Sequence, residues 1–132
     1  MAVVVFDADV LIGFLNGADG HHAPAIERVQ RALALAERRV MSAVNYAEVI
    51  VGPSKRGITF VQRVDVMFQR FGIQVIAVDQ VMARAAAQIR ARTRLGLPDA
   101  FVLAVASREG VDGTEVRIES FDDRLLMVAA SE

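Results

Sequence analysis

The chain has 132 residues, enough for one hydrophobic core and too few for two ordinary domains, so we expect a single domain over residues 1–132. Although 54% of the residues are hydrophobic, no uncharged apolar stretch approaches the roughly 20 residues needed to cross a bilayer, and the absence of cysteine excludes disulfides and thiolate zinc sites. The net charge of −1 leaves any affinity for nucleic acid to a local patch, and 14 of the 15 basic residues are Arg, which can bind phosphate with two hydrogen bonds.

The first apolar run, at residues 3–6, is β-branched and aromatic and predicts a buried strand. Asp7 and Asp9 interrupt the apolar pattern and no basic segment precedes it, so it does not look like an export signal and we expect a cytoplasmic location. A helix is predicted from Asp7 to Leu15. The next helix is opened by Pro24 and closed by Arg38 and Arg39, and its apolar face carries Ile26, Val29, Leu33 and Ala36. A short apolar segment at 40–41 leads into a helix at 43–51, which Ser42 caps and Gly52-Pro53 ends. A further helix is predicted to begin near Thr59.

The second half of the chain repeats the alternation of strand and helix. A strand is predicted at 73–78, and Asp79 caps a long helix that reaches about Leu95. After a break at 96–98, a short apolar helix is predicted at 99–109, and a last strand at 114–121. This alternation favours an α/β fold with a parallel sheet.

Three acids follow predicted strands, namely Asp7, Asp79 and Asp122. In an open parallel sheet, ligand sites form beyond the carboxyl ends of the strands. Each acid also has a purely structural explanation, because Asp at a helix N-terminus accepts hydrogen bonds from free backbone N–H groups. Asp79 has no other unusual neighbour and is interpreted as a cap only.

Two further acids lie in helices that are otherwise nearly apolar. Glu48 interrupts the helix at 43–51, where it either forms a polar stripe with Asn45 or faces a cavity or partner. Asp99 follows Pro98 at the start of an apolar helix, where it is either a cap or a ligand. The pattern of residues leaves both alternatives open.

Taken together, these acids suggest a cation site. If Asp7, Glu48, Asp99 and Asp122 converge, each pair of charges at ~4 Å would repel by up to ~4 kcal/mol at an effective dielectric constant of about 20. Oxygen ligands favour Mg²⁺ or Mn²⁺, and these ions support phosphodiester hydrolysis. The two His residues, at 21–22, lie in a Gly-rich loop and are interpreted as solvated loop residues.

The opening motif by itself, Asp7-Ala8-Asp9-Val10 after an apolar strand, resembles the first motif of haloacid-dehalogenase-type phosphatases. That resemblance implies Asp7 as nucleophile and Asp9 as general acid. The family also has a basic residue on a helix near the acid pair, whereas the one Lys, Lys55, is predicted in a Gly-Pro-Ser-Lys-Arg-Gly loop. The chain is also short for that family.

Nearly the full length resembles the PIN-domain ribonucleases, and among them the VapC-type toxins. Four motifs follow that family's order: Asp7-Ala8-Asp9-Val10-Leu11-Ile12 after a strand, Glu48 on a helix, Leu97-Pro98-Asp99-Ala100 opening an apolar helix, and Ser120-Phe121-Asp122 after the last strand. The resemblance implies a single PIN-like α/β domain, with a parallel central sheet flanked by helices. It implies a Mg²⁺- or Mn²⁺-dependent endoribonuclease toxin that is inhibited by a cognate VapB-type antitoxin and forms a homodimer. The catalytic residues it implies are Asp7, Glu48, Asp99 and Asp122, the three Asp residues being the metal ligands.

Two residues depart from the family pattern. Asp9 stands where the family has a small hydroxyl residue, and is interpreted as a neighbour of the metal site or as an extra ligand. Asp123 adjoins Asp122, so either could be the fourth acid, with Ser120 beside them.

Contacts to RNA have weaker support from the sequence. Arg90 and Arg94 share a helical face and, with Arg92, precede Asp99, so they either hold RNA phosphates or form a solvated helix face. The phosphatase reading and a non-catalytic PIN-like binding module remain as alternatives to the nuclease.

Overall fold

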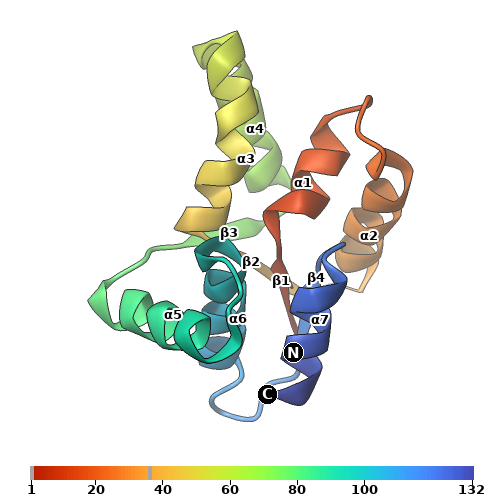
Figure 1. Ribbon diagram of the computed structural model, residues 1–132. Helices are drawn as coiled ribbons and strands as arrows, with labels where there is room; N and C mark the ends of the chain where they lie inside the picture. Colours follow the sequence, from red (N-terminus) through yellow and green to blue (C-terminus); the bar gives the residue numbers. More distant parts are fainter. Residues whose placement is uncertain (1, 36) are drawn as a thin grey trace.

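The computed structural model describes residues 2–35 and 37–132 and shows a four-stranded sheet with helices on both faces (Figure 1). All strands are parallel and lie in the order β3-β2-β1-β4. The strands are β1 (Val3–Phe6), β2 (Arg38–Ser42), β3 (Ile73–Ile76) and β4 (Val116–Glu119), and the helices are α1 (Ala8–Leu15), α2 (His22–Ala34), α3 (Ala43–Arg56), α4 (Ile58–Arg70), α5 (Gln80–Thr93), α6 (Leu97–Glu109) and α7 (Asp123–Ser131). The predicted α/β class with a parallel central sheet is confirmed.

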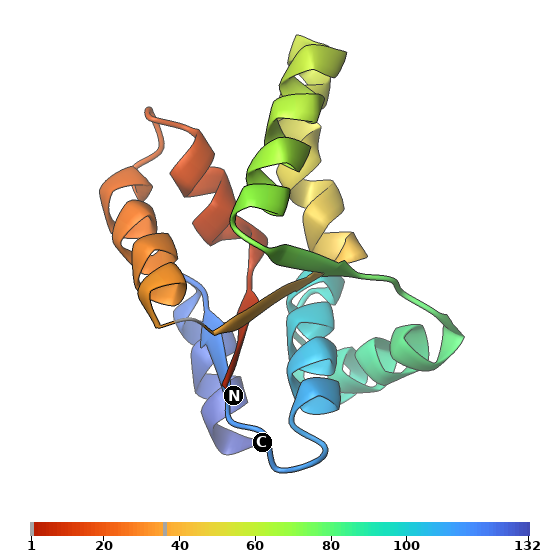
Figure 2. The same ribbon diagram turned by 180° about the vertical axis from the view of Figure 1, so that it is seen from behind.

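Alternate side chains of β1 enter two separate cores. Val3 and Val5 pack with apolar side chains of α5, α6 and α7, whereas Val4 and Phe6 pack against α1, α2, α3 and α4. Figures 1 and 2 show these two groups of helices on opposite faces of the sheet. Burial on both faces explains why the strand is continuously apolar rather than alternating.

Two Arg residues that were predicted to close the second helix instead begin β2. Arg38 pairs with Val3 in the strand register, and its guanidinium makes an ion pair of 2.5 Å with Glu109. Arg39 donates from Nε to the carbonyl oxygen of Phe71 at 2.6 Å. Because both guanidinium groups have partners, β2 can begin with two charged residues. Ala36, counted on the apolar face of that helix, lies outside the described residues.

Helix α3 is longer than the predicted helix at 43–51, because it continues through Gly52 and Pro53 to Arg56. Proline has no N–H, so it removes one backbone hydrogen bond near the helix end. Helix α4 runs back beside the extended part of α3 (Figure 1). Lys55, predicted in a loop, therefore lies in the last helical turn, and the turn into α4 is at Gly57, whose φ of 122° is accessible to glycine.

The outer strands β3 and β4 are shorter than the predicted strands at 73–78 and 114–121, because pairing with their neighbours stops at Ile76 and Glu119. Helix α6 begins two residues before Asp99, which places that acid in the first helical turn. Within the described residues, no helix is long and apolar enough to cross a membrane.

A buried network of charges joins β4 to α2. The carboxylate of Glu119, whose side chain is 2% exposed, makes ion pairs with Arg28 at 3.3 Å, with Arg31 at 2.6 Å and with Arg117. Arg117 also pairs with the buried Glu37 at 2.5 Å. Because Glu119 is surrounded by cations, its burial does not leave a charge without a partner.

We expect Glu119→Gln to lower the free energy of unfolding by about 3–5 kcal/mol, because the neighbouring guanidinium groups lose the charge that compensates them. Urea unfolding followed by circular dichroism measures this change. The matched control is Glu132→Gln, which removes the exposed Arg92–Glu132 pair and should change stability by less than about 1 kcal/mol. Equal losses in the two variants would contradict a special role for the buried network.

Candidate active site

Asp7 lies where β1 ends and α1 begins, and both of its carboxyl oxygens are engaged. Its Oδ1 accepts from the backbone N–H of Ala8 at 2.7 Å, and its Oδ2 accepts from the hydroxyl of Ser120 at 2.7 Å. The Ser120 oxygen also accepts from the backbone N–H of Asp122 at 3.0 Å. Burial raises the pKa of Asp7 above its ordinary value, even though the two hydrogen bonds oppose this shift. Ser120 thus connects the ends of the neighbouring strands β1 and β4.

Asp9, in the first turn of α1, packs against the same end of β4. Its Oδ2 accepts from the backbone N–H of Phe121 at 3.0 Å, while its Oδ1 is buried with no hydrogen-bond partner among the described residues. Burial, together with the charge of Asp7, raises the pKa of Asp9 to about 6. One oxygen of Asp9 is therefore structural, and the other is free to accept a further bond.

Glu48, on α3, is held in place by the buried side chain of Asn45. The Asn45 amide donates to Glu48 Oε1 at 3.1 Å and to the carbonyl oxygen of Pro98 at 3.0 Å, and its own oxygen accepts from the Ser42 hydroxyl at 2.6 Å. Burial raises the pKa of Glu48, and the charge of Asp7 raises it further. The polar stripe and the site were alternatives in the sequence, but the structure combines them: Asn45 orients Glu48 and also fixes the start of α6.

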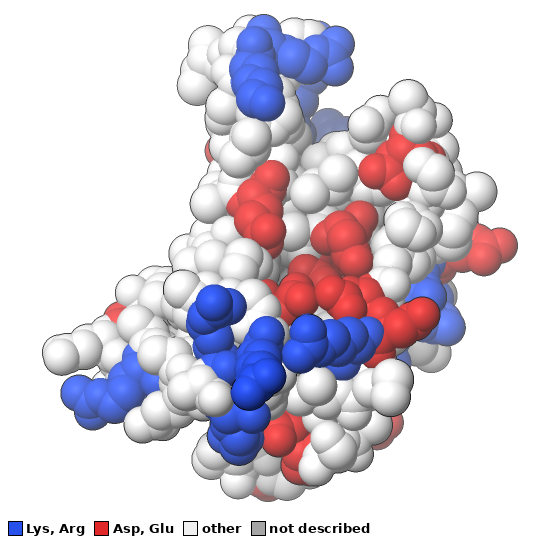
Figure 3. Space-filling model, viewed as in Figure 1, with Lys and Arg blue, Asp and Glu red and all other residues white. Residues whose placement is uncertain are grey.

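Asp99 brings the remaining acids together. Its pKa is raised to about 7, first by burial, then by a hydrogen bond shared with Asp122, and then by the charges of Asp7, Asp122 and Glu48. Asp122 is also the N-cap of α7, accepting from the backbone N–H of Leu125 at 3.1 Å. Figure 3 shows acidic side chains gathered in the middle of one face of the molecule, with basic side chains beside them. We call Asp7, Glu48, Asp99 and Asp122 the acidic cluster.

Other candidates lie apart from the acidic cluster. Asp123 is exposed in the first turn of α7 and has no hydrogen bond or ion pair with the cluster among the described residues. Asp79 caps α5 by accepting from the Met82 backbone N–H at 2.8 Å, as the sequence indicated. His21 is exposed, as the sequence indicated, whereas His22 is half-buried, and both make contacts within the protein. His21 stacks on Phe121 with ring centroids 4.4 Å apart, and His22 Nδ1 lies 2.7 Å from the carbonyl oxygen of Gly13.

The donor set of the acidic cluster fits a hard divalent cation in chemistry and charge. All of its donors are carboxylate oxygens, and the charges of neighbouring acids add to burial in raising the pKa values of Asp7, Glu48 and Asp99. Within the described residues, no three His, Asp or Glu side chains are arranged so that they could hold a metal ion as they stand. Closing a metal site around the cluster therefore requires side-chain rotation.

The Arg residues predicted to contact RNA do not share one helical face. Arg90 donates to the carbonyl oxygen of Leu95 at 3.0 Å, and Arg92 pairs with Glu132. Arg94 is the C-cap of α5 with a left-handed φ of 63°, so it has left the helical repeat that the spacing assumed. Arg124, which the sequence reading missed, donates to the carbonyl oxygen of Thr93 at 3.1 Å.

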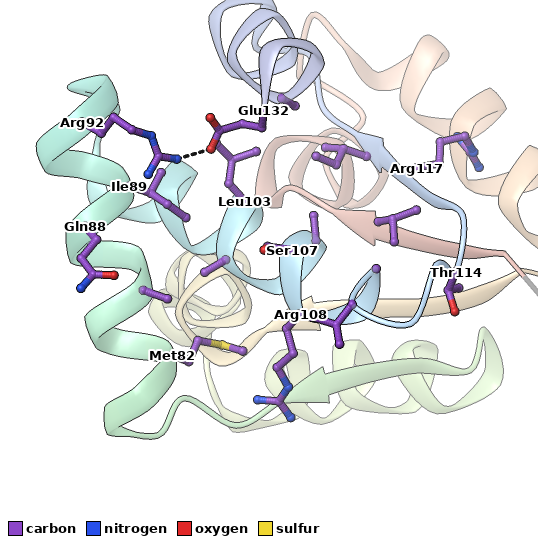
Figure 4. A pocket seen from close by; sticks show the side chains of 18 of the residues that line it. Met82, Gln88, Ile89, Arg92, Leu103, Ser107, Arg108, Thr114, Arg117 and Glu132 are labelled. Carbon is purple, nitrogen blue, oxygen red and sulfur yellow. Dashed lines mark hydrogen bonds and ion pairs between the residues drawn. The ribbon is translucent and has the colours of Figure 1, made fainter.

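A large cavity elsewhere in the molecule is not lined by the acidic cluster. It encloses about 1130 Å³ between α5, α6, β4 and α7. Figure 4 shows Ile89 and Leu103 pointing into it, with the Arg92–Glu132 pair at one end and Arg108 and Thr114 at the other. A chemical site is therefore better judged here by the convergence of ionisable groups than by cavity size.

Comparison with known proteins identifies the family of this chain. The family model for the PIN domain matches residues 4–130. A solved toxin–antitoxin complex from Klebsiella pneumoniae contains a similar chain, with 25% identity and a TM-score of 0.65, the match covering 86% of this chain and 82% of that one. VapBC2 from Rickettsia felis bound to a promoter DNA fragment has a similar fold, with 12% identity and a TM-score of 0.63, over 91% of this chain and 99% of that one. Among curated proteins, none matches the sequence.

The raised pKa values predict that the protein becomes more stable as the pH falls. A carboxyl whose pKa rises from 3.8 unfolded to about 7 folded binds more protons in the folded state between these values, so stability declines as the pH rises through that window. We expect Asp99→Asn to raise the Tm at pH 8 by on the order of 3 °C in the presence of a chelator, and to weaken the pH dependence. Thermal melts between pH 5 and 8 test this, with Asp79→Asn as a control that should follow the wild type. A lower Tm for Asp99→Asn at pH 8 would contradict it.

Proposed function

The chain belongs to the PIN-domain family, and from this premise we propose that it is the nuclease toxin of a toxin–antitoxin pair, a Mg²⁺- or Mn²⁺-dependent endoribonuclease that hydrolyses RNA phosphodiester bonds. The observation that carries the proposal is the mutual electrostatic influence of the acidic cluster at the carboxyl end of the sheet. Grouping acids whose charges help to raise the pKa values of Asp7, Glu48 and Asp99 is costly to the fold unless a cation or a reaction uses the group.

Each acid has a role suited to its surroundings. Asp7, Asp99 and Asp122 would hold the cation, which when bound would polarise the scissile phosphate and lower the pKa of a water molecule. Glu48 is placed to accept a proton from the attacking water, because Asn45 fixes one of its oxygens and its raised pKa makes it a stronger base. Asp9 accepts a hydrogen bond from the backbone N–H of Phe121 and so helps to hold the segment that carries Asp122.

Ser120 and Asn45 keep this arrangement in register. Ser120 donates to Asp7 and accepts from the Asp122 backbone, so it links the acid that follows β1 to the acid that follows β4. Asn45 does the same for α3 and α6. Both residues act through hydrogen bonds to their neighbours rather than on the substrate.

The alternative of a phosphatase with Asp7 as nucleophile has little support. The family model that matches is that of the PIN domain, over residues 4–130. A non-catalytic PIN-like binding module would retain the same fold, and is distinguished from the nuclease by whether RNA is cleaved.

The partners we propose are an RNA substrate, a cognate VapB-type antitoxin and a second copy of the chain. The antitoxin is supported by the solved toxin–antitoxin complex that contains a similar chain. The homodimer is supported by large apolar side chains left exposed on the surface, such as Val81, Val111 and Met127. A toxin that cleaves cellular RNA would act in the cytoplasm.

We expect Asp122→Asn to lower the rate of RNA cleavage in Mg²⁺ by at least about 100-fold, because it removes a charge of the proposed cation site. Asparagine can still cap α7, so the fold should persist. Incubation of the purified chain, freed of copurifying peptide, with total RNA measures the rate. The matched control is Asp79→Asn, which makes the same change at the cap of α5 and should stay within about twofold of wild type. Full cleavage by Asp122→Asn, or in the presence of a chelator, would contradict the proposal.

We also expect Mg²⁺ to raise the Tm of the wild-type chain. Binding to the folded state adds about 1.4 kcal/mol of stability for each tenfold excess of the ion over its dissociation constant. Asp99→Asn should abolish this rise, whereas Asp79→Asn should preserve it. Equal rises in all three proteins would show that Mg²⁺ acts elsewhere on the molecule.

A further inference from the structure

The far end of the α3–α4 hairpin is a projecting, basic surface that the fold does not need for its core. Residues 51–63, which we call the hairpin tip, stand away from the rest of the molecule (Figures 1 and 2), and none of them is buried. Ile58, at the turn, is 69% exposed. Such an extension adds little hydrophobic stability, so another function is expected of it.

The charge of the hairpin tip is of one sign. It contains Lys55, Arg56 and Arg63 and no acid, and Figure 3 shows basic side chains at this end of the molecule. The nearest acid on the hairpin, Asp65, accepts a hydrogen bond from the Tyr46 hydroxyl. In a chain with a net charge of −1, this is a local concentration of positive charge.

Two of the three cations of the hairpin tip stack on an aromatic ring. Among the described residues, ion pairs bind Arg28, Arg31, Arg38, Arg92 and Arg117, but none of the three tip cations. Instead, two guanidinium groups lie over the ring of Phe60, Arg56 at 4.1 Å and Arg63 at 5.4 Å from its centroid. Stacking on a ring occupies the face of a guanidinium and leaves its N–H groups, which lie in the plane, free for an anion.

The hairpin tip lies at a defined distance from the acidic cluster, because Glu48 and Arg56 belong to the same helix. Eight residues separate them, which corresponds to about 12 Å at a rise of about 1.5 Å per residue. A stacked strand of nucleic acid rises about 3.4 Å per nucleotide, so this distance spans about three or four nucleotides. A strand in the acidic cluster could reach the tip with its own phosphates.

We propose that the hairpin tip binds the phosphate backbone of the RNA, about three or four nucleotides from the bond that is cleaved. This inference rests on the proposed nuclease function. The acidic cluster repels phosphate, and the chain has no general positive charge, so a polymeric substrate needs a separate basic surface to hold it. Stacked Arg side chains on a rigid helical hairpin supply that surface.

The test compares two double variants that remove the same charge. Arg56→Gln with Arg63→Gln alters the tip, and Arg84→Gln with Arg108→Gln removes two other exposed Arg residues that have no ion pairs among the described residues. Fluorescence anisotropy in a chelator, which prevents cleavage, measures binding to labelled single-stranded RNAs of about 12 and about 4 nucleotides. Gln is a good helix former, and thermal melts check that both variants are folded.

For the tip variant, we expect the Kd of the longer RNA to rise about 10-fold, and the slope of log K against log salt to fall by about 1.4, which corresponds to two lost phosphate contacts. The shorter RNA and the control variant should change by less than about twofold. In Mg²⁺, the tip variant should have a raised KM for the longer RNA and an unchanged kcat.

Other outcomes would overturn the inference, and they can be distinguished from failure of the proposed nuclease function. Equal losses in both variants would indicate a general effect of charge. Unchanged RNA binding by the tip variant, with loss of binding to a labelled poly-glutamate peptide, would assign the tip to an acidic protein partner. If the wild type cleaves RNA and the tip variant binds it normally, only the inference fails; if the wild type binds RNA through the tip and does not cleave it, only the nuclease fails.

Discussion

Repulsion among the carboxyls of the acidic cluster is the constraint on which the arrangement around it depends. Burial and the charges of neighbouring acids raise the pKa values of Asp7, Glu48 and Asp99, and hydrogen bonds hold these groups with no ion pair to them among the described residues. Ser120 and Asn45 provide these bonds, each contacting two of the segments that carry the acids. Among the described residues no ion pair neutralises these acids, and carboxylate oxygens are ligands that a hard divalent ion prefers.

At the preceding residue of the chain, Glu119, the negative charge is instead compensated by Arg side chains. Glu119 precedes Ser120, yet its carboxylate is surrounded by guanidinium groups of α2 and β4. Glu119 therefore has compensating charges within the protein, whereas the acids that Ser120 contacts at the carboxyl end of the sheet form no ion pairs among the described residues. The Arg residues that the composition suggested for phosphate binding are partly committed to such ion pairs. Others have no ion pair among the described residues, including Arg56 and Arg63 at the hairpin tip.

The sequence could predict the fold class, and which acids follow a strand, because these depend on local patterns. Strands alternating with helices give the parallel sheet, and an acid directly after a strand lies at its carboxyl end. The ends of elements were less predictable: Pro53 did not end α3, and Arg38 and Arg39 began a strand because pairing with β1 and β3 decided it. Ser42 was predicted as the cap of α3, whereas the hydrogen bonds of Asn45 to Pro98 and of Arg124 to Thr93 were not predicted, since folding alone brings these partners close. For Asn45, its spacing of three residues from Glu48 was the available signal.

The sheet ends on both sides in a strand of four residues, β3 and β4. An exposed outer strand offers free N–H and C=O groups to any other extended chain, and long, flat, apolar edges lead to aggregation. In β4, the side chains of Arg117 and Glu119 form ion pairs with each other, with α2 and with Glu37. Because each outer strand has only four residues, little free edge is available for another extended chain to pair with.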